Sequence, residues 1–400
     1  MKVLLRKVKK EVEPFHRNVS DLEVAGESLR VRLVRQLKEL EASFEEIDEG
    51  IEISKGEKYL EITQNVVLSD LFLKKLLRHA NESKGNTQYG LRSSSTLILT
   101  SDLKRHEAPL AIRYFSDSKE KNFEWYYFDV QHDFEISVGV PALVYGEANL
   151  KLRFFESYAG VIEHWNDLHH MNSLIARELC AKWARRASLF FPSAMIEKIM
   201  LHPFWAKRFN RIAPSAKIHP TAIIEGSVIE DGAEITAHCY IRASIIGRGA
   251  TVRESSSIKM STIGPRSYLM TCDLFNSVVE AQSFIVTNVL HNSHVGFGTF
   301  VGGGSGFSDF HVNREPINLQ LRSGAHQTSS KFLGSATGEN CFIGAGLLFK
   351  PGLAIPHSSR IFSSDLIQNS PDRPNATFVN HQGQLVQIPQ QFLVSKKKDL

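Results

Sequence analysis

The sequence has 400 residues, of which 42% are hydrophobic, and 47 basic against 43 acidic residues leave a formal net charge of +4. So small a charge does not indicate a nucleic-acid-binding surface, and no apolar run is as long as a signal peptide or a membrane span. The four cysteines lack the C-x-x-C spacing of a zinc site and predict no disulfide framework. We therefore expect a cytoplasmic protein of two or three domains, with no membrane span and no nucleic-acid partner.

Residues 1–155 mix strand-like and helix-like segments and predict an α/β domain. The segment Leu22–Leu40 has the pattern of a short strand, a turn and an amphipathic helix, and Tyr59–Ala80 has a second strand-to-helix pattern. Between Ser95 and Tyr145, runs of β-branched and aromatic residues predict further strands that complete the sheet.

Residues 156–210 predict a helical connector. His164–Arg186 carries apolar residues at helical spacing, and Pro192–Phe209 is expected to form a helix that covers the open end of the next domain. The histidines of the first helix do not indicate a metal site, because His169 and His170 are adjacent and therefore point apart on a helix.

A repeat of aliphatic residues follows, in steps of six, six and five that make a period of seventeen. This period predicts a solenoid with three short strands in each coil, that is, a parallel β-helix. A β-sandwich would instead show alternation with a period of two and irregular spacing. The residues expected to point into the core are Ile212, Ile218, Ile224, Ile229, Ile235, Ile241, Ile246, Val252, Ile258 and Ile263.

Small and polar residues such as Gly226, Gly232 and Gly264 lie between the aliphatic ones and predict the corners, where glycine permits a positive φ. The coils are expected to span residues 211–361, with looser spacing after Ile263. The stretch Arg314–Lys331 is expected to leave the coil as an excursion. Residues 362–400 are expected to form a C-terminal tail with a short hairpin.

The stretch APSAKIHPTAIIEGSVIEDGAEITAHCYIRASIIGRGATV, which begins at Ala213, resembles the hexapeptide-repeat transferases. It is most similar to the C-terminal half of the bifunctional N-acetylglucosamine-1-phosphate uridyltransferase/acetyltransferases and of related sugar nucleotidyltransferases. This resemblance implies a left-handed β-helix, a homotrimer, and acyl-CoA bound along the solenoid between subunits.

The first 155 residues resemble the nucleotidyltransferase half of the same proteins in a degenerate form. Asp70 matches the metal-binding aspartate of that half, which implies Mg²⁺ if the domain is active. The glycine-rich loop that cradles a nucleotide phosphate is absent, because the first 21 residues contain no glycine. An ordinary strand-end or N-cap role is the other interpretation of Asp70.

The order VGFGTFVGGGSGFSDFHVN, excursion, TGENCFIGAGLLFKPG resembles the glycine-rich coil, the substrate-contact loop and the next coil of the family. The position of the family's catalytic histidine falls at about Val286, which is not a base. The nearby histidines are therefore the candidates: His291, His294, His311 and His326.

Among these histidines, we predict His311 and His326 as catalytic residues. We add Asp309, which matches a substrate-contact asparagine of the family. Glycines leave room for a ligand against the backbone, and basic residues of the excursion provide donors for an anion. The predicted cofactor-binding residues are Gly302, Gly303, Gly304, Arg322 and Lys331.

The function expected from the resemblance is acyl transfer, with acetyl-CoA or another acyl-CoA as the donor. The acceptor would be an amino-sugar phosphate or a nucleotide sugar. Two alternatives stay open. The first is a catalytically inactive trimeric scaffold or sugar-nucleotide-binding protein, and the second is a sugar-1-phosphate nucleotidyltransferase.

Overall fold

The chain falls into two compact units, which we describe separately. The first unit comprises Met1–Val12 and Arg17–His202, and the second comprises Glu13–His16 and Pro203–Leu400. The computed structural model describes residues 1–51, 58–92, 94, 107–116, 122–139, 149–192, 195–196, 206–311, 315–362, 366–367, 369–382 and 384–389.

The first unit is built on a six-stranded mixed sheet with the order β4-β1-β5-β8-β7-β9. Strand β1 pairs in parallel with β4 and β5, whereas β8 is antiparallel to β5 and β7. Two smaller antiparallel pairs accompany the sheet, β6 with β12 and β10 with β11. The strands are β1 (Lys2–Arg6), β4 (Phe44–Ile47), β5 (Tyr59–Thr63), β6 (Val66–Leu68), β7 (Thr87–Arg92), β8 (Glu107–Phe115), β9 (Glu124–Phe128), β10 (Phe134–Gly139), β11 (Asn149–Phe154) and β12 (Ala159–Val161).

The two predicted strand-to-helix segments are confirmed. Strands β2 (Glu23–Val24) and β3 (Glu27–Ser28) form a small hairpin that leads into α1 (Leu29–Glu39), and β6 leads into α2 (Asp70–Glu82). A serine caps each helix, since the Ser28 and Ser69 hydroxyls accept hydrogen bonds from backbone N–H groups of the first turn. Both helices bury one apolar stripe, with Leu29, Leu33 and Leu37 in α1 and Phe72, Leu73 and Leu76 in α2.

Helix α5 (Trp165–Ala187) forms the predicted long helix. Its N-terminus is closed by Asp167, whose carboxylate accepts hydrogen bonds from the backbone N–H groups of Glu163 and His164. Most of the predicted helix at Pro192–Phe209 lies outside the described residues, apart from a 3₁₀ turn at Lys207–Phe209. None of the described helices combines the length and apolarity that a membrane-spanning helix needs.

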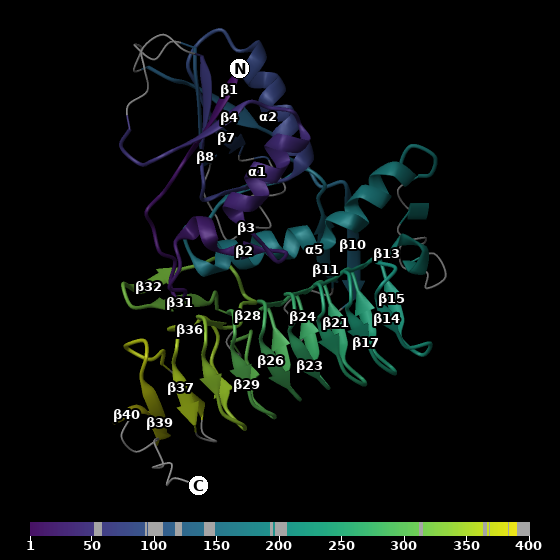
Figure 1. The fold of residues 1–400 in the computed structure, drawn as a ribbon, viewed down its shortest axis with the longest axis vertical. Helices are drawn as coiled ribbons and strands as arrows, with labels where there is room; N and C mark the ends of the chain where they lie inside the picture. The colour runs from purple at the N-terminus through teal and green to yellow at the C-terminus, as the bar shows by residue number, and fades with distance from the viewer. Residues whose placement is uncertain are drawn as a thin grey trace. The chain divides into compact units, whose positions relative to one another are not determined.

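The second unit is a three-sided parallel β-helix, as the period predicts (Figure 1). Each coil gives one strand to each of three sheets, here called the first, second and third faces, and neighbouring coils pair in parallel. This arrangement is consistent with the expected left-handed β-helix.

The strands of the first face are β13 (Arg211–Ile212), β16 (Val228–Ile229), β19 (Ile245–Ile246), β22 (Thr262–Ile263), β25 (Val278–Val279), β28 (His294–Val295), β33 (Ala336–Thr337) and β36 (Ala354–Ile355). Those of the second face are β14 (Lys217–Ile218), β17 (Glu234–Ile235), β20 (Thr251–Val252), β23 (Tyr268–Met270), β26 (Phe284–Val286), β29 (Phe300–Val301), β34 (Phe342–Ile343), β37 (Arg360–Phe362), β39 (Thr377–His381) and β40 (Gln384–Ile388). The third face contains β15 (Ile223–Glu225), β18 (Tyr240–Arg242), β21 (Ser257–Lys259), β24 (Asp273–Phe275), β27 (Val289–His291), β30 (Gly306–Phe307), β35 (Leu348–Phe349) and β38 (Leu366–Ile367).

The predicted aliphatic residues form the core of the solenoid from Ile224 onward. The prediction fails at Ile212, which is 43% exposed, because the first coil has a neighbouring coil on one side only. The period also shortens along the chain. Ser244 bonds to Ser227, 17 residues earlier, whereas Cys272 bonds to Ser256, 16 residues earlier, which explains the looser spacing after Ile263.

Buried serines satisfy the backbone at one corner of the stack. From Ser244 onward, the amide of each serine donates to the hydroxyl of the serine one coil before it, at distances of 3.0–3.2 Å. The corner would otherwise bury amides that have no strand partner. This explains why a hydroxyl residue recurs at each period, in a row formed by Ser227, Ser244, Ser261, Ser277 and Ser293.

A positive φ, the reason predicted for glycine at the corners, applies to only some of the corner glycines. Gly226 and Gly232 have a positive φ, whereas Gly247 does not. A Cβ at Gly247 would lie 2.8 Å from the carbonyl oxygen of Ile263, so this glycine serves the close stacking of coils. Several left-handed corners carry other residues, among them Asn276 (φ 48°) and Asn292 (φ 47°).

The predicted excursion is confirmed and is longer than expected. The coil stops at Phe307 and resumes at β33, because His294 pairs directly with Ala336. Within the excursion, β31 (Asn318–Leu321) and β32 (Gly324–Gln327) form an antiparallel hairpin. The predicted tail hairpin is also present as β39 and β40, which extend the second face.

Candidate functional site

A cluster of polar side chains lies on the third face, on β21, β24 and β27. His291 Nε2 is 3.6 Å from Asp273 Oδ2, and Lys259 Nζ is 3.7 Å from Asp273 Oδ1. The register of the face places Lys259, Phe275 and His291 on adjacent strands, and the Phe275 ring meets the imidazole edge-on at 5.9 Å. The imidazole therefore lies between an aromatic ring and a carboxylate while 34% of its side chain stays exposed.

A row of amides connects this cluster to the excursion. Asn276 Nδ2 donates to Asn292 Oδ1 at 2.7 Å, and Asn292 Nδ2 donates to Asp309 Oδ2 at 2.6 Å. Both asparagines adopt the left-handed conformation, which asparagine tolerates better than most residues. The carbonyl oxygen of Asp309 also accepts from the Leu333 amide, where the chain returns to the coil. Asp309 is thus fixed beside the coil that carries His291.

The predicted catalytic residues do not form a single hydrogen-bonded group. His311 is half-buried and makes no hydrogen bond or ion pair with another described residue. His326 is exposed on β32, opposite Leu319. Of the predicted residues, the structure therefore links only Asp309, through Asn292, to the coil of His291.

The cationic residues of the excursion also differ from one another. Lys331 is exposed at the end of the excursion. Arg322 lies in the turn of the β31–β32 hairpin, where its backbone N–H donates to Glu13 at 2.7 and 2.9 Å. Its guanidinium Nε is 3.7 Å from Glu13 Oε1, and the side chain is 44% exposed. Arg322 already has an anionic partner in this structure.

The pairing of His291 with Asp273 has the composition of a general base. The carboxylate lies on the side of one ring nitrogen, Nε2, and so leaves the other nitrogen for a substrate proton. Sequence reasoning considered His291 but did not select it. The overlooked signal was that Asp273 and His291 are separated by one coil and two residues, which places them diagonally on one face.

His294, another of the considered histidines, is enclosed in the protein. Its Nε2 lies 3.1 Å from Glu280 Oε1, the side chains are 0% and 1% exposed, and the Phe15 ring packs against it at 5.0 Å. Glu280 also accepts the Phe297 amide at 3.1 Å. Such burial favours a structural role over a catalytic one.

The three predicted cofactor-binding glycines serve different purposes. A Cβ at Gly302 would lie 2.8 Å from the Ala345 nitrogen, and Gly304 has a φ of 75°. A Cβ at Gly303 would meet only ordinary contacts, the nearest at 3.6 Å to the Val286 oxygen. Coil geometry explains Gly302 and Gly304, so Gly303 is the glycine that best tests for a ligand.

We predict that Gly302→Ala destabilises the second unit by about 1–3 kcal/mol, because the new methyl group overlaps the backbone of the next coil. Gly303→Ala should change stability by less than about 0.5 kcal/mol. Urea denaturation followed by circular dichroism measures both values. Equal losses for the two variants would contradict this assignment of the glycines.

In the first unit, the candidate metal ligand Asp70 is the first residue of α2 and accepts a 2.8 Å hydrogen bond from Gln36 Nε2. Burial alone raises the pKa of Asp70. The bond from Gln36 and the nearby cations Lys182, Arg32 and Arg35 outweigh burial and hold the pKa below its ordinary value. No group of three His, Cys, Asp or Glu side chains suited to a metal occurs among the described residues. The described residues therefore do not complete a Mg²⁺ site, and that site remains a prediction.

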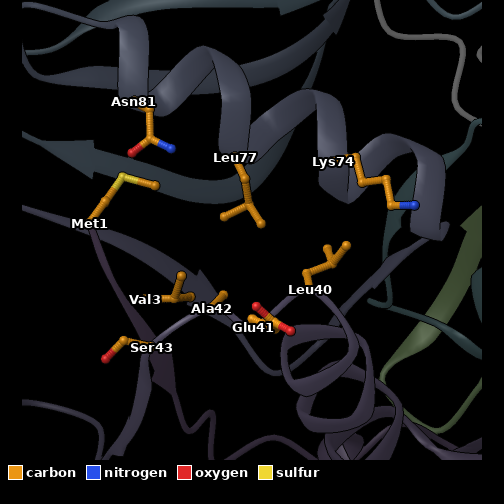
Figure 2. Close-up of a pocket in the computed structure, with 9 residues that line it drawn as sticks. All are labelled: Met1, Val3, Leu40, Glu41, Ala42, Ser43, Lys74, Leu77 and Asn81. Atoms are coloured by element: carbon orange, nitrogen blue, oxygen red, sulfur yellow. The ribbon is translucent and has the colours of Figure 1, made fainter.

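The first unit also contains a pocket of about 510 Å³ between the start of β1, the loop after α1 and one side of α2 (Figure 2). Asp70 is not among its lining residues, and Met1 and Val3 place the pocket at the amino end of β1. Open α/β sheets bind ligands beyond the carboxyl ends of their strands. The lining residues are Met1, Val3, Leu40, Glu41, Ala42, Ser43, Lys74, Leu77 and Asn81.

No protein-family model and no curated protein matches the chain. Among solved structures, the chain is similar to a UDP-N-acetylglucosamine acyltransferase from Francisella novicida, with 12% identity over 45% of this chain and 68% of that chain and a TM-score of 0.25. It is similar to a hexapeptide transferase family protein from Anaplasma phagocytophilum, with 13% identity, 46% and 81% coverage and a TM-score of 0.21. A third neighbour is the acetyltransferase domain of PglB from Neisseria gonorrhoeae FA1090 in complex with acetyl coenzyme A, with 16% identity, 52% and 66% coverage and a TM-score of 0.14. The structural neighbours thus include hexapeptide-repeat and acyl-transferring enzymes.

Proposed function

We propose that the β-helix unit transfers an acyl group from an acyl-CoA, such as acetyl-CoA, to the amine of an amino-sugar phosphate or nucleotide sugar. The observation that supports this proposal is the Asp273–His291 pair on an exposed face, beside the excursion. A partly exposed imidazole with a carboxylate 3.6 Å from one ring nitrogen suits removal of a proton from an amine during acyl transfer.

In this proposal, His291 Nδ1 removes a proton from the attacking amine while Nε2 faces Asp273. The amine nitrogen bonds to the thioester carbon, the carbon–sulfur bond breaks, and the proton passes to the leaving thiolate of coenzyme A. Asp309 and His311 would contact the acceptor, and Gly302, Gly303 and Gly304 would leave room for the donor. Arg322, His326 and Lys331 would bind the phosphate groups of the ligands.

Thermal unfolding in the presence of ligands tests the donor class. A ligand that binds only the folded protein stabilises it by about 2.7 kcal/mol at one hundred times its dissociation constant. We expect acetyl-CoA and at least one nucleotide sugar or amino-sugar phosphate to raise the melting temperature. The proposal fails if coenzyme A esters leave the melting temperature unchanged at millimolar concentration.

An exposed row of aromatic side chains on the second face supports the expected self-association. Adjacent rings on β23, β26, β29, β34 and β37 have centroids 4.6–5.5 Å apart, and four of the five residues are 36–39% exposed. Contiguous exposed apolar surface of this kind marks interaction sites. The row comprises Tyr268, Phe284, Phe300, Phe342 and Phe362.

We predict that light scattering gives a homotrimer, with three times the chain mass of 45.0 kDa. The double variant Phe284→Asp/Phe342→Asp should shift the mass toward the monomer, because it places charges in the aromatic row. Val31→Asp, at a position that is 52% exposed on α1, is the matched control. A wild-type protein that is monomeric at micromolar concentration would refute the prediction.

A further inference from the structure

Residues Glu13–His16, here called the strap, belong to the second unit although the residues on both sides of them belong to the first. Each residue of the strap has its own contact within the second unit. Pro14 lies against Gly338, Phe15 is 2% exposed and packs on His294, and Glu13 lies at the turn of the excursion hairpin. The strap is therefore a docked segment of chain.

The contact of Glu13 resembles that of a bound anion. Both carboxylate oxygens accept from one backbone N–H, that of Arg322, at 2.7 and 2.9 Å, and the guanidinium Nε is 3.7 Å away. A turn amide and a guanidinium that converge on one carboxylate form the type of receptor that proteins use for phosphate and carboxylate groups. The hairpin turn therefore presents an anion-binding site that the chain itself occupies.

The remaining strap contacts do not depend on Glu13. The His16 amide donates to Glu339 Oε2 at 2.9 Å, and the His16 ring stacks on His357 with centroids 4.3 Å apart and an interplanar angle of 15°. Phe15 lies between Glu13 and His16 in the sequence, and its buried ring packs on His294. Loss of the Glu13 carboxylate should accordingly leave the strap docked.

We propose that the turn at Arg322 binds a phosphate group of a ligand and that Glu13 holds this site in the ligand-free protein, so that strap and ligand compete for the same donors. The inference rests on the proposed function, in which Arg322 contacts an anionic donor or acceptor. The inference adds to the proposed function that Glu13 competes with the ligand for Arg322. Release of Glu13 is the step that must accompany ligand entry.

The environment of Glu13 makes such an exchange favourable. Its side chain is 18% exposed, and burial raises the pKa of the carboxyl against the opposing effect of Arg322. Displaced into water, the carboxylate would regain its hydration, and a phosphate would bring more negative charge to the same guanidinium.

Titration calorimetry with inorganic pyrophosphate tests the competition in the full chain. Glu13→Gln should lower the dissociation constant of pyrophosphate about tenfold, as expected if the competitor occupies the site in about nine of ten molecules. Arg322→Ala combined with Glu13→Gln should reduce the gain, because it removes the guanidinium and keeps the backbone N–H. Glu124→Gln removes the same charge from an exposed residue of the first unit, outside its pocket, and should change nothing. Repeating the titrations with coenzyme A and with uridine diphosphate identifies whether donor or acceptor phosphates use the turn.

An unchanged or weaker pyrophosphate affinity in Glu13→Gln would overturn the proposal and leave the Glu13–Arg322 contact as a structural tether. Absence of pyrophosphate binding in every variant would also overturn it. Either result would remove Arg322 from the proposed phosphate contacts, whereas acyl transfer itself is measured separately as release of the coenzyme A thiol. If the strap is only structural, Glu13→Gln should lower the melting temperature without tightening any ligand.

Discussion

Replacing His291 by alanine should lower the rate of acyl transfer about 10²- to 10⁴-fold, the usual contribution of a positioned general base. The KM for acetyl-CoA should change little, because the imidazole acts on the amine in the transition state and does not hold the donor. The side chain is partly exposed on the third face, so its loss should leave the melting temperature within a few degrees of the wild type. The measurement is steady-state release of the coenzyme A thiol with an amino-sugar acceptor.

Two further variants make this prediction specific. Asp273→Asn keeps the shape of the side chain and removes its charge, so it should reduce kcat by a smaller factor than His291→Ala. His311→Ala should affect the KM for the acceptor more than kcat if His311 only contacts the substrate. A larger loss of kcat in His311→Ala than in His291→Ala would show that His311, the residue selected from the sequence, is the base.

Replacing Glu280 by alanine should destabilise the second unit by about 3 kcal/mol. The Glu280 and His294 side chains are 1% and 0% exposed, and removing one member of a buried ion pair is strongly destabilising. The Phe297 amide would lose its acceptor as well. Chemical denaturation measures the free energy of unfolding.

Glu280→Gln is the control for this loss, because its amide oxygen can still accept from Phe297. It should retain part of the stability that Glu280→Ala loses. Acyl transfer per folded molecule should stay near the wild-type value in both variants, since the pair is enclosed. A loss below about 1 kcal/mol in Glu280→Ala would mean that water enters the site and replaces the carboxylate.

The coils could be predicted from the sequence because the core side chains repeat with the coil itself. Each turn of the solenoid places one aliphatic residue on each face, so the period of Ile229, Ile235 and Ile241 reports the geometry directly. The reasons for the corners were harder to predict. The stacking distance that requires Gly247, and the serine row that includes Ser244, involve residues one coil apart that no local pattern displays.

The candidate site was predicted only in part, because it depends on contacts between coils and across the whole chain. Asp309 was selected, but the amide row that fixes it through Asn292 depends on a left-handed corner. Arg322 was expected to face a ligand, whereas its partner is Glu13, which is 309 residues away in the sequence. A contact at that separation leaves no signal in composition or periodicity.

The most direct test of the proposed function is detection of the acylated product. The protein is incubated with acetyl-CoA labelled in the acetyl group and with amino-sugar phosphates and nucleotide sugars as acceptors, and the products are analysed by mass spectrometry. Acetyl transfer at the third face predicts one N-acetylated product, formed in equal amount with free coenzyme A by the wild type and almost absent with His291→Ala. Equal product formation by the wild type and His291→Ala, or no product from a wild-type protein that binds both substrates, would contradict it.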